Sequence, residues 1–273
     1  MDNAPSLNEF FNWDYAPFGN TNPGLANWFT QKEQRMHILA DSLLVQGGSF
    51  AITGPPGTGK SVFARSILSH LDKNCYNSYF VPYSGYKCYG LLRTLADVIG
   101  LDVSGRLMPP LTKIQKHIFQ QKSKTNAQFP VIVIDDAQQL PEKSFYDLCS
   151  LLIEPVTRTS SASLLLVGDY GLKQRLRLNI MEPILSRLAV LFELDPLSKE
   201  ETLSFIAYRL NKAKAPKDLF DRSALELIAA SCKGNRRDIL QMCTVLLLEA
   251  YQRKERLVSA ELIHTCSLLK NTG

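Results

Sequence analysis

The sequence predicts an α/β fold in which a parallel sheet lies between two layers of helices and is followed by a small all-helical part. Two observations carry this prediction. Short apolar stretches typical of buried strands, such as residues 131–134 and 163–167, alternate with segments of helical periodicity. After Pro196 the strand-like stretches stop, and only helical periodicity remains.

The individual elements follow from local patterns along the chain. A helix over residues 28–45 is expected to end at Gly47 and Gly48, and the apolar residues 49–53 then form a strand that runs into a glycine-rich turn. Further elements are predicted in alternation: helices over residues 61–71, 91–99 and 111–121, and strands over residues 79–81, 131–134 and 163–167.

The C-terminal part begins with a helix start signal. Ser198 and Glu201 form a capping-box pattern, and the apolar residues that follow recur at helical spacing. Two later segments, around Ile228 and around Cys243, repeat that spacing. We therefore expect three domains: an aromatic-rich segment with a lead-in helix (1–46), a three-layer αβα domain (47–195) and a helical domain (196–273).

The composition excludes several classes of protein. Hydrophobic residues make up 45% and charged residues 21% of the 273 residues, as in soluble globular proteins. No apolar run approaches the ~18 residues of a membrane span. The first residues carry no Lys or Arg, so we expect no signal peptide. The six cysteines show neither a CxxC pair nor zinc spacing, and we expect reduced thiols in a cytoplasmic protein.

The strongest motif is a phosphate-binding loop. Residues 54–61 fit GxxxxGK[ST] at every position, after a predicted strand and before a predicted helix. Main-chain N–H groups of such a loop surround phosphates, Lys60 reaches the β- and γ-phosphates, and the Ser61 hydroxyl holds Mg²⁺. The alternative is a glycine-rich turn that binds nothing. The expected nucleotide contacts are Gly54, Pro55, Pro56, Gly57, Thr58, Gly59, Lys60, Ser61 and Val62.

A pair of carboxylates follows the apolar strand at residues 131–134. Ligands of open α/β sheets lie at the carboxyl ends of the strands, where Asp135 and Asp136 emerge. We expect Asp135 to hold Mg²⁺ and Asp136 to polarise the attacking water. A solvated strand end is the alternative. With the phosphate loop, these residues predict a protein that binds a nucleoside triphosphate.

Five segments together resemble the AAA+ ATPases, a family of P-loop NTPases with an αβα domain and a helical lid. They are GPPGTGKS at 54–61, IDDAQQL at 134–140, LLLVGD at 164–169, ILSRL at 184–188 and GNRRDI at 234–239. Within that family, YAPF at 15–18, DDAQ at 135–138 and VGDYGL at 167–172 are similar to the ExeA/TnsC/MuB-like group. That group includes transposition ATPases and a secretion ATPase.

The resemblance implies roles for four further residues. Asp169 matches the sensor 1 position, and Arg187 matches the arginine finger that reaches the γ-phosphate bound by a neighbouring subunit. Arg237 matches sensor 2, with Arg236 as a competitor for that role. Arg187 as a surface salt-bridge residue, and the two arginines as helix-start or DNA-phosphate contacts, are the alternatives. The implied cofactors are ATP and Mg²⁺, and a finger that acts in trans implies an oligomer.

Two positions depart from the family pattern. The family has Asp-Glu where this chain has Asp135-Asp136, and the shorter second side chain predicts slow hydrolysis with a long-lived ATP state. Sensor 1 is usually a neutral polar residue, whereas Asp169 is acidic. A carboxylate near the γ-phosphate is unfavourable unless it pairs with a cation or orients water.

The positive charge is concentrated in one stretch. The net charge is +5, but residues 51–130 carry +7 and residues 131–195 carry −3. We expect the basic stretch to bind duplex DNA without sequence preference, through phosphate contacts. A solvated helix face is the alternative for any single lysine. The candidate DNA contacts are Lys87, Arg106, Lys113 and Lys116.

These observations favour an ATP-dependent DNA-binding regulator of transposition that selects targets, recruits a transposase and assembles into a ring or helical filament on duplex DNA. One rival is a helicase loader or initiator-type AAA+ ATPase. A second is a secretion-assembly ATPase like ExeA, which we expect to carry a membrane span and a wall-binding domain beyond residue 273. A third is a nucleotide-switched signalling module without nucleic acid. No membrane contact is expected.

Overall fold

The computed structural model describes residues 5–19, 27–83, 90–104, 108–122 and 127–266. The chain divides into two compact units. The helical unit comprises Met1–Thr30, Pro56–Gly59 and Asp195–Gly273, and the sheet unit comprises Gln31–Pro55 and Lys60–Leu194. The domain boundaries drawn from the sequence, at residues 46 and 195, remain predictions.

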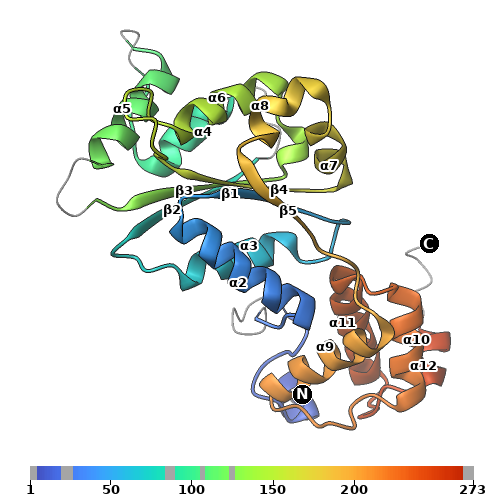
Figure 1. The fold of residues 1–273 in the computed structure, drawn as a ribbon. Coiled ribbons are helices and arrows are strands. Elements are labelled where there is room, and N and C mark those ends of the chain that lie inside the picture. The colour runs from blue at the N-terminus through green and yellow to red at the C-terminus, as the bar shows by residue number, and fades with distance from the viewer. Residues whose placement is uncertain (1–4, 20–26, 84–89, 105–107, 123–126, 267–273) are drawn as a thin grey trace. The chain divides into compact units, whose positions relative to one another are not determined.

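The sheet unit contains five parallel strands in the order β2-β3-β4-β1-β5. The strands are β1 (Ser49–Thr53), β2 (Tyr76–Pro82), β3 (Phe129–Asp135), β4 (Ser163–Gly168) and β5 (Leu188–Glu193). Helices cover both faces of this sheet (Figure 1), which confirms the predicted three-layer αβα fold of a P-loop NTPase.

The helices of the sheet unit form two layers. One face of the sheet carries α2 (Gln31–Val45) and α3 (Lys60–His70) (Figure 1). The opposite face carries α4 (Gly90–Ile99), α5 (Pro110–Lys122), α6 (Glu142–Leu152), α7 (Tyr170–Leu176) and α8 (Glu182–Leu185). Within the described part of the chain, no helix combines the length and apolarity needed to cross a bilayer.

The two central strands β3 and β4 are apolar because both of their faces are covered. Ile132 and Leu164 are fully buried and pack in one cluster with Leu95 of α4, Ile114 of α5 and Leu148 of α6. Each such side chain contributes about 1.5–3 kcal/mol by leaving water. The alternate residues Val133 and Leu165 are also fully buried, so residues 131–134 and 163–167 lack the polar alternation of half-exposed strands.

Strand β5 was missing from the sequence prediction. Among the described residues it is an edge strand whose one partner is β1, with Phe50 opposite Val190 and Thr53 opposite Glu193. Only Phe192 of this strand is buried. Residues 188–192 are nevertheless five consecutive apolar residues, a strand signal that the sequence prediction did not use.

The helical unit contains α1 (Leu7–Phe11), α9 (Lys199–Lys212), α10 (Arg222–Cys232), α11 (Arg236–Gln252) and α12 (Ala260–Thr265). The predicted capping box at the start of α9 is present: Glu201 N–H donates to Ser198 Oγ at 3.1 Å, and Ser198 N–H donates to Glu201 Oε2 at 2.9 Å. The N-terminal aromatics Phe11, Trp13 and Phe18 are buried in the core of this unit.

Arg209 of α9 ties the N-terminal segment to this core. Its side chain is almost fully buried, and it donates from Nε to the carbonyl of Pro17 at 2.7 Å and from Nη2 to the carbonyl of Gly19 at 2.8 Å. Burial lowers the pKa of Arg209 to about 10. The residue still carries its charge at neutral pH, and it satisfies two main-chain carbonyls.

Gly234, between α10 and α11, is predicted to tolerate no side chain. Its φ is +76°, and a Cβ atom there would lie 2.0 Å from the carbonyl oxygen of Leu197. Gly100 is the matched control, because its φ is +80° but a Cβ atom would meet nothing within 4 Å. Both alanine variants carry the left-handed backbone cost of roughly 1–2 kcal/mol.

Gly234→Ala should lower the free energy of unfolding by a further 1–3 kcal/mol or so, because the main chain must shift. Chemical denaturation followed by circular dichroism measures both variants. Equal losses in the two variants would contradict the close packing at Gly234.

Candidate functional site

The candidate site lies at the carboxyl ends of three adjacent strands. Strand β4 pairs with β1 on one side, with Ile52 opposite Val167, and with β3 on the other, with Ile134 opposite Leu166. Because the strands are parallel, the segments that follow them leave the sheet at the same edge. This is the edge at which open α/β sheets bind their ligands.

The loop after β1 has the conformation of a phosphate cradle. Gly57 and Gly59 have φ values of +82° and +94°, a region that favours glycine. Lys60 begins α3, and its Nζ donates to the carbonyl of Pro55 at 2.8 Å across the loop. Ser61 lies in the first turn of the helix, where main-chain N–H groups lack helical acceptors. These donors fit a bound phosphate.

Residues 56–59 of this loop are held by the start of α11 within the helical unit. Asn235 caps α11 by accepting from the N–H groups of Arg237 and Asp238, and its Nδ2 donates to the carbonyl of Pro56 at 3.1 Å. The N–H of Arg237 also donates to the carbonyl of Gly57 at 3.2 Å. No motif predicted the role of Asn235, because 179 residues separate it from Pro56.

The structure separates the two arginines that compete for the sensor 2 role. The Arg236 side chain is buried, donates through Nη1 to the carbonyl of Thr58 and lies 5.9 Å from the centre of the Trp28 ring. The Arg237 side chain is exposed. Arg236 therefore stabilises the loop, whereas Arg237 is the arginine whose charge faces solvent.

The two carboxylates after β3 differ in environment. Asp135 is half-buried, and its Oδ1 accepts from the N–H of Asp136 at 3.1 Å. Asp136 is exposed and has a left-handed backbone, with φ of +56° and ψ of +36°, which is uncommon for a residue other than glycine. The described residues contain no group of three His, Cys, Asp or Glu side chains able to hold a metal ion. Mg²⁺ at such sites uses one or two protein oxygens and substrate phosphates, and Ser61 and Asp135 can supply these oxygens.

Asp169 serves as the N-cap of α7. Its Oδ1 accepts from the N–H of Gly171 at 2.8 Å and from that of Leu172 at 3.4 Å. A carboxylate is favoured at a helix start because of the unpaired N–H groups and the helix dipole. The cap gives a physical reason for an acidic residue where the resemblance implies a neutral one.

Arg187 follows α8 and folds back on its own chain. Its Nη1 donates to the carbonyl of Pro183, and its Nε is buried without a hydrogen-bond partner among the described residues. Burial raises the pKa of the nearby Cys149 thiol, and the charge of Arg187 opposes this shift. The use of Arg187 by a neighbouring subunit remains a prediction.

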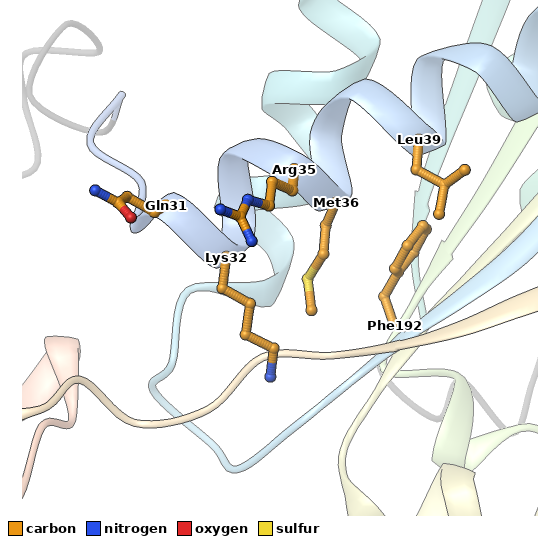
Figure 2. Close-up of a pocket in the computed structure, with 6 residues that line it drawn as sticks. All are labelled: Gln31, Lys32, Arg35, Met36, Leu39 and Phe192. Carbon is orange, nitrogen blue, oxygen red and sulfur yellow. The ribbon is translucent and has the colours of Figure 1, made fainter.

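A pocket of about 460 Å³ lies between α2 and the edge strand (Figure 2). It is lined by Gln31, Lys32, Arg35, Met36, Leu39 and Phe192. The carbonyl of Phe192 accepts from Thr53 Oγ1 at 3.2 Å, and Thr53 directly precedes the phosphate loop. The pocket thus lies beside the strand end from which the loop leaves. This pocket was not predicted from the sequence, because β5 was not among the predicted strands.

The candidate DNA contacts are only partly placed. Lys116 of α5 is exposed, whereas Lys113 is half-buried and its Nζ donates to the carbonyl of Asp102 at 3.1 Å. Lys87 and Arg106 lie outside the described residues. Of the two placed lysines, Lys116 has the more accessible charge.

The fold and the site define a P-loop nucleotide-binding protein. The AAA domain family matches residues 44–176, which include the phosphate loop, Asp135 and Asp169. The chain is 24% identical over 248 residues to General secretion pathway protein A of Aeromonas hydrophila, which covers 90% of this chain and 45% of the relative. It is 30% identical over 196 residues to the Replication factor C small subunit of Sulfurisphaera tokodaii. That alignment covers 71% of this chain and 51% of the relative. The chain thus spans about half the length of these curated relatives.

Solved structures show the same fold. The ORC2 protein of Aeropyrum pernix, in ADPNP and ADP complexes, superposes with a TM-score of 0.72 at 15% identity, over 95% of this chain and 72% of that one. The ORC1 protein of the same organism, in complex with DNA, superposes with a TM-score of 0.68 at 16% identity. The superposition covers 92% of this chain and 69% of that one. The comparisons support a AAA+ ATPase at the level of the class, and they do not select the transposition group.

The cap at Asp169 leads to a prediction about stability. Asp169→Ala leaves the first N–H groups of α7 without a partner and should lower the free energy of unfolding by about 1 kcal/mol. Asp169→Asn is the matched control, because an amide oxygen still accepts from Gly171 and Leu172 and the loss should stay within about 0.5 kcal/mol. Urea titration of the three proteins measures the difference. A larger loss in the asparagine variant would show that charge, and not capping, holds this position.

Proposed function

We propose that this chain binds and hydrolyses ATP and that the bound nucleotide controls the assembly of several copies on duplex DNA. The arrangement of the phosphate loop, Lys60 and Asp135 at one sheet edge is the observation that carries this proposal. The AAA domain match supports the nucleotide. The likeness to the Replication factor C small subunit, and to the fold of a DNA-bound ORC1 protein, supports DNA as a partner.

Different residues of the chain would have different roles at the bound nucleotide. Main-chain N–H groups of residues 57–60 and the Lys60 amine would hold the phosphates, and Lys60 would give up its contact with Pro55 to do so. Ser61 and Asp135 would hold Mg²⁺, which supplies positive charge to the reacting phosphate oxygens. Asp136 would orient the attacking water and accept a hydrogen bond from it.

The pocket between α2 and β5 is the proposed site of the base. Its volume suits part of a nucleotide, and the apolar side chains of Met36, Leu39 and Phe192 suit a flat ring. The amide of Gln31 can hydrogen-bond a ring edge, and Lys32 and Arg35 supply further hydrogen-bond donors at the pocket.

Hydrolysis is proposed to be slow. Asp136 is shorter than the glutamate of the family and lies on an exposed turn, so it orients water less well. A slow step makes the ATP-bound state long-lived, which suits a switch that orders an assembly. A turnover above ~10 s⁻¹, near the median for enzymes, would contradict this part of the proposal.

Arg187 and Arg237 are the cations proposed to reach a nucleotide, Arg187 from a neighbouring copy and Arg237 from the same chain. Arg187 would have to leave Pro183, and its buried, unpartnered Nε makes the observed position a costly one. A guanidinium at the γ-phosphate stabilises the charge of the transition state, so hydrolysis would depend on assembly.

The biological role is proposed to be target selection in DNA transposition, on the motif resemblance to the ExeA/TnsC/MuB-like group. The initiator or helicase-loader role is the second candidate, favoured by the ORC-like fold. A secretion role is favoured by the similarity to General secretion pathway protein A. A transposase reading frame beside the one that encodes this chain would favour the first role. Failure to bind DNA in any nucleotide state would favour the third.

Assembly on DNA is the direct test. Negative-stain electron microscopy of the protein with duplex DNA and a slowly hydrolysed ATP analogue should show rings or filaments, and ADP should abolish them. Lys60→Ala should also abolish them, because it removes a cation from the phosphate site. Lys217→Ala, which alters an exposed lysine of the helical unit, is the control that should still assemble. Monodisperse copies beside naked DNA would refute the proposal.

The candidate DNA contacts Lys113 and Lys116 lead to a prediction about the salt dependence of DNA binding. Lys116→Ala should weaken DNA binding and reduce the slope of log K against log salt by about 1, because one phosphate contact is lost. Lys113→Ala should have a smaller effect, since its amine is bonded to the carbonyl of Asp102. Titrations at several salt concentrations, with Lys217→Ala as control, measure both variants. Slopes equal to that of the wild type would place the DNA elsewhere.

A further inference from the structure

Gln138 joins the carboxylate of Asp136 to helix α7. It lies in η2 (Ala137–Gln139), the short turn after β3, and is half-buried. Its Nε2 donates to Asp136 Oδ1 at 3.2 Å, and its Oε1 accepts from the main-chain N–H of Asp169 at 3.3 Å. One side chain therefore connects the turn after β3 with the end of β4.

The partners define the orientation of this amide. A carboxylate oxygen can only accept a hydrogen bond, and a main-chain N–H can only donate one. The reversed amide would place its oxygen against the carboxylate of Asp136 and its NH₂ group against the N–H of Asp169. The observed orientation is thus the one in which both contacts of Gln138 are favourable.

A side chain of helix α7 also contacts the main chain of Gln138. Arg175 Nη1 donates to the carbonyl of Gln138 at 2.7 Å. The amide also packs closely over the end of β4, where a Cβ atom on Gly168 would lie 2.8 Å from Gln138 Oε1. Gln138 is thus fixed by α7 and by β4, whereas Asp136 itself is exposed.

We propose that Gln138 is a positioning residue for Asp136, and that the placement of α7 thereby controls how well the chain orients the attacking water. This inference rests on the proposed ATPase function. Gln138 transfers no proton; it holds one oxygen of the carboxylate and leaves the other for water. The short side chain of Asp136 makes such support necessary, because small displacements of a reacting group cost much of the rate.

The same helix leads toward Arg187. Helix α7 is followed by η3 (Asn179–Met181), α8 and then Arg187. A neighbouring copy that engages Arg187 would pull on this segment, and α7 would transmit the displacement to Gln138 and Asp136. The chain segment of α7, η3 and α8 connects Arg187 with the hydrogen bonds of Gln138.

The test uses the full chain with Mg-ATP and measures kcat, KM and the affinity for a fluorescent ATP analogue. Gln138→Ala should lower kcat about 10-fold or more and leave nucleotide affinity within about twofold, because the phosphate contacts are untouched. Gln139→Ala is the matched control, since Gln139 belongs to the same turn and its side chain is exposed. It should leave all three quantities unchanged.

Gln138→Glu separates positioning from a merely structural role. It keeps an oxygen for the N–H of Asp169 but replaces the donor to Asp136 with a second carboxylate. Two adjacent carboxylates resist joint ionisation, so the acid limb of the pH–rate profile should move up by about half a unit or more. Gln138→Ala should lower the rate without this displacement.

Three outcomes would overturn the inference. Wild-type protein without turnover, with or without DNA, would refute the proposed function together with the inference. Wild-type turnover with equal rates in Gln138→Ala and Gln139→Ala would refute the inference alone. A loss of rate that matches a loss of thermal stability, with an unmoved pH profile in Gln138→Glu, would assign Gln138 a structural role only.

Discussion

The parallel pairing of β3, β4 and β1 is the constraint on which the candidate site depends. Lys60 and Asp135 are 75 residues apart in the chain, and they come to one edge because β4 pairs with both β1 and β3. The pairing persists because every residue of β1 and β4 is buried. Burial of these strands removes their main-chain groups from water, so the ladder hydrogen bonds must form. The positions of the loops then follow from the register.

The phosphate loop depends on more than its glycines. Gly57 and Gly59 permit the turn, but Asn235 and Arg236 hold it through the carbonyls of Pro56 and Thr58. Asn235 has two tasks, since its oxygen caps α11 while its amide donates to the loop. The GNRR segment is therefore part of the loop's support as well as a source of cations. This arrangement links the conformation of the loop that is proposed to contact phosphate to the start of a helix far along the sequence.

The acidic residues of the site have separate physical tasks. Asp169 stabilises the start of α7, Asp135 lies at the strand end, and Asp136 emerges on an exposed left-handed turn. Gln138 contacts two of these segments, and Arg175 holds it from α7. The chemistry proposed for Asp136 therefore depends on the helix that Asp169 caps. The proposed slow hydrolysis and its proposed dependence on assembly would follow from a short carboxylate supported by this helix.

The sequence by itself determined the features that rest on local pattern. Strands β3 and β4 are apolar runs, Ser198 and Glu201 are three residues apart, and the phosphate loop is a contiguous motif, so each was predictable. Tertiary structure alone decided which distant segments meet: the pairing of β5 with β1, the pocket between Met36 and Phe192, and the contact of Asn235 with Pro56. It also distinguished Arg236 from Arg237. The physical reason is that these contacts depend on the order of strands in the sheet and on burial, and neither is encoded in the spacing of neighbouring residues.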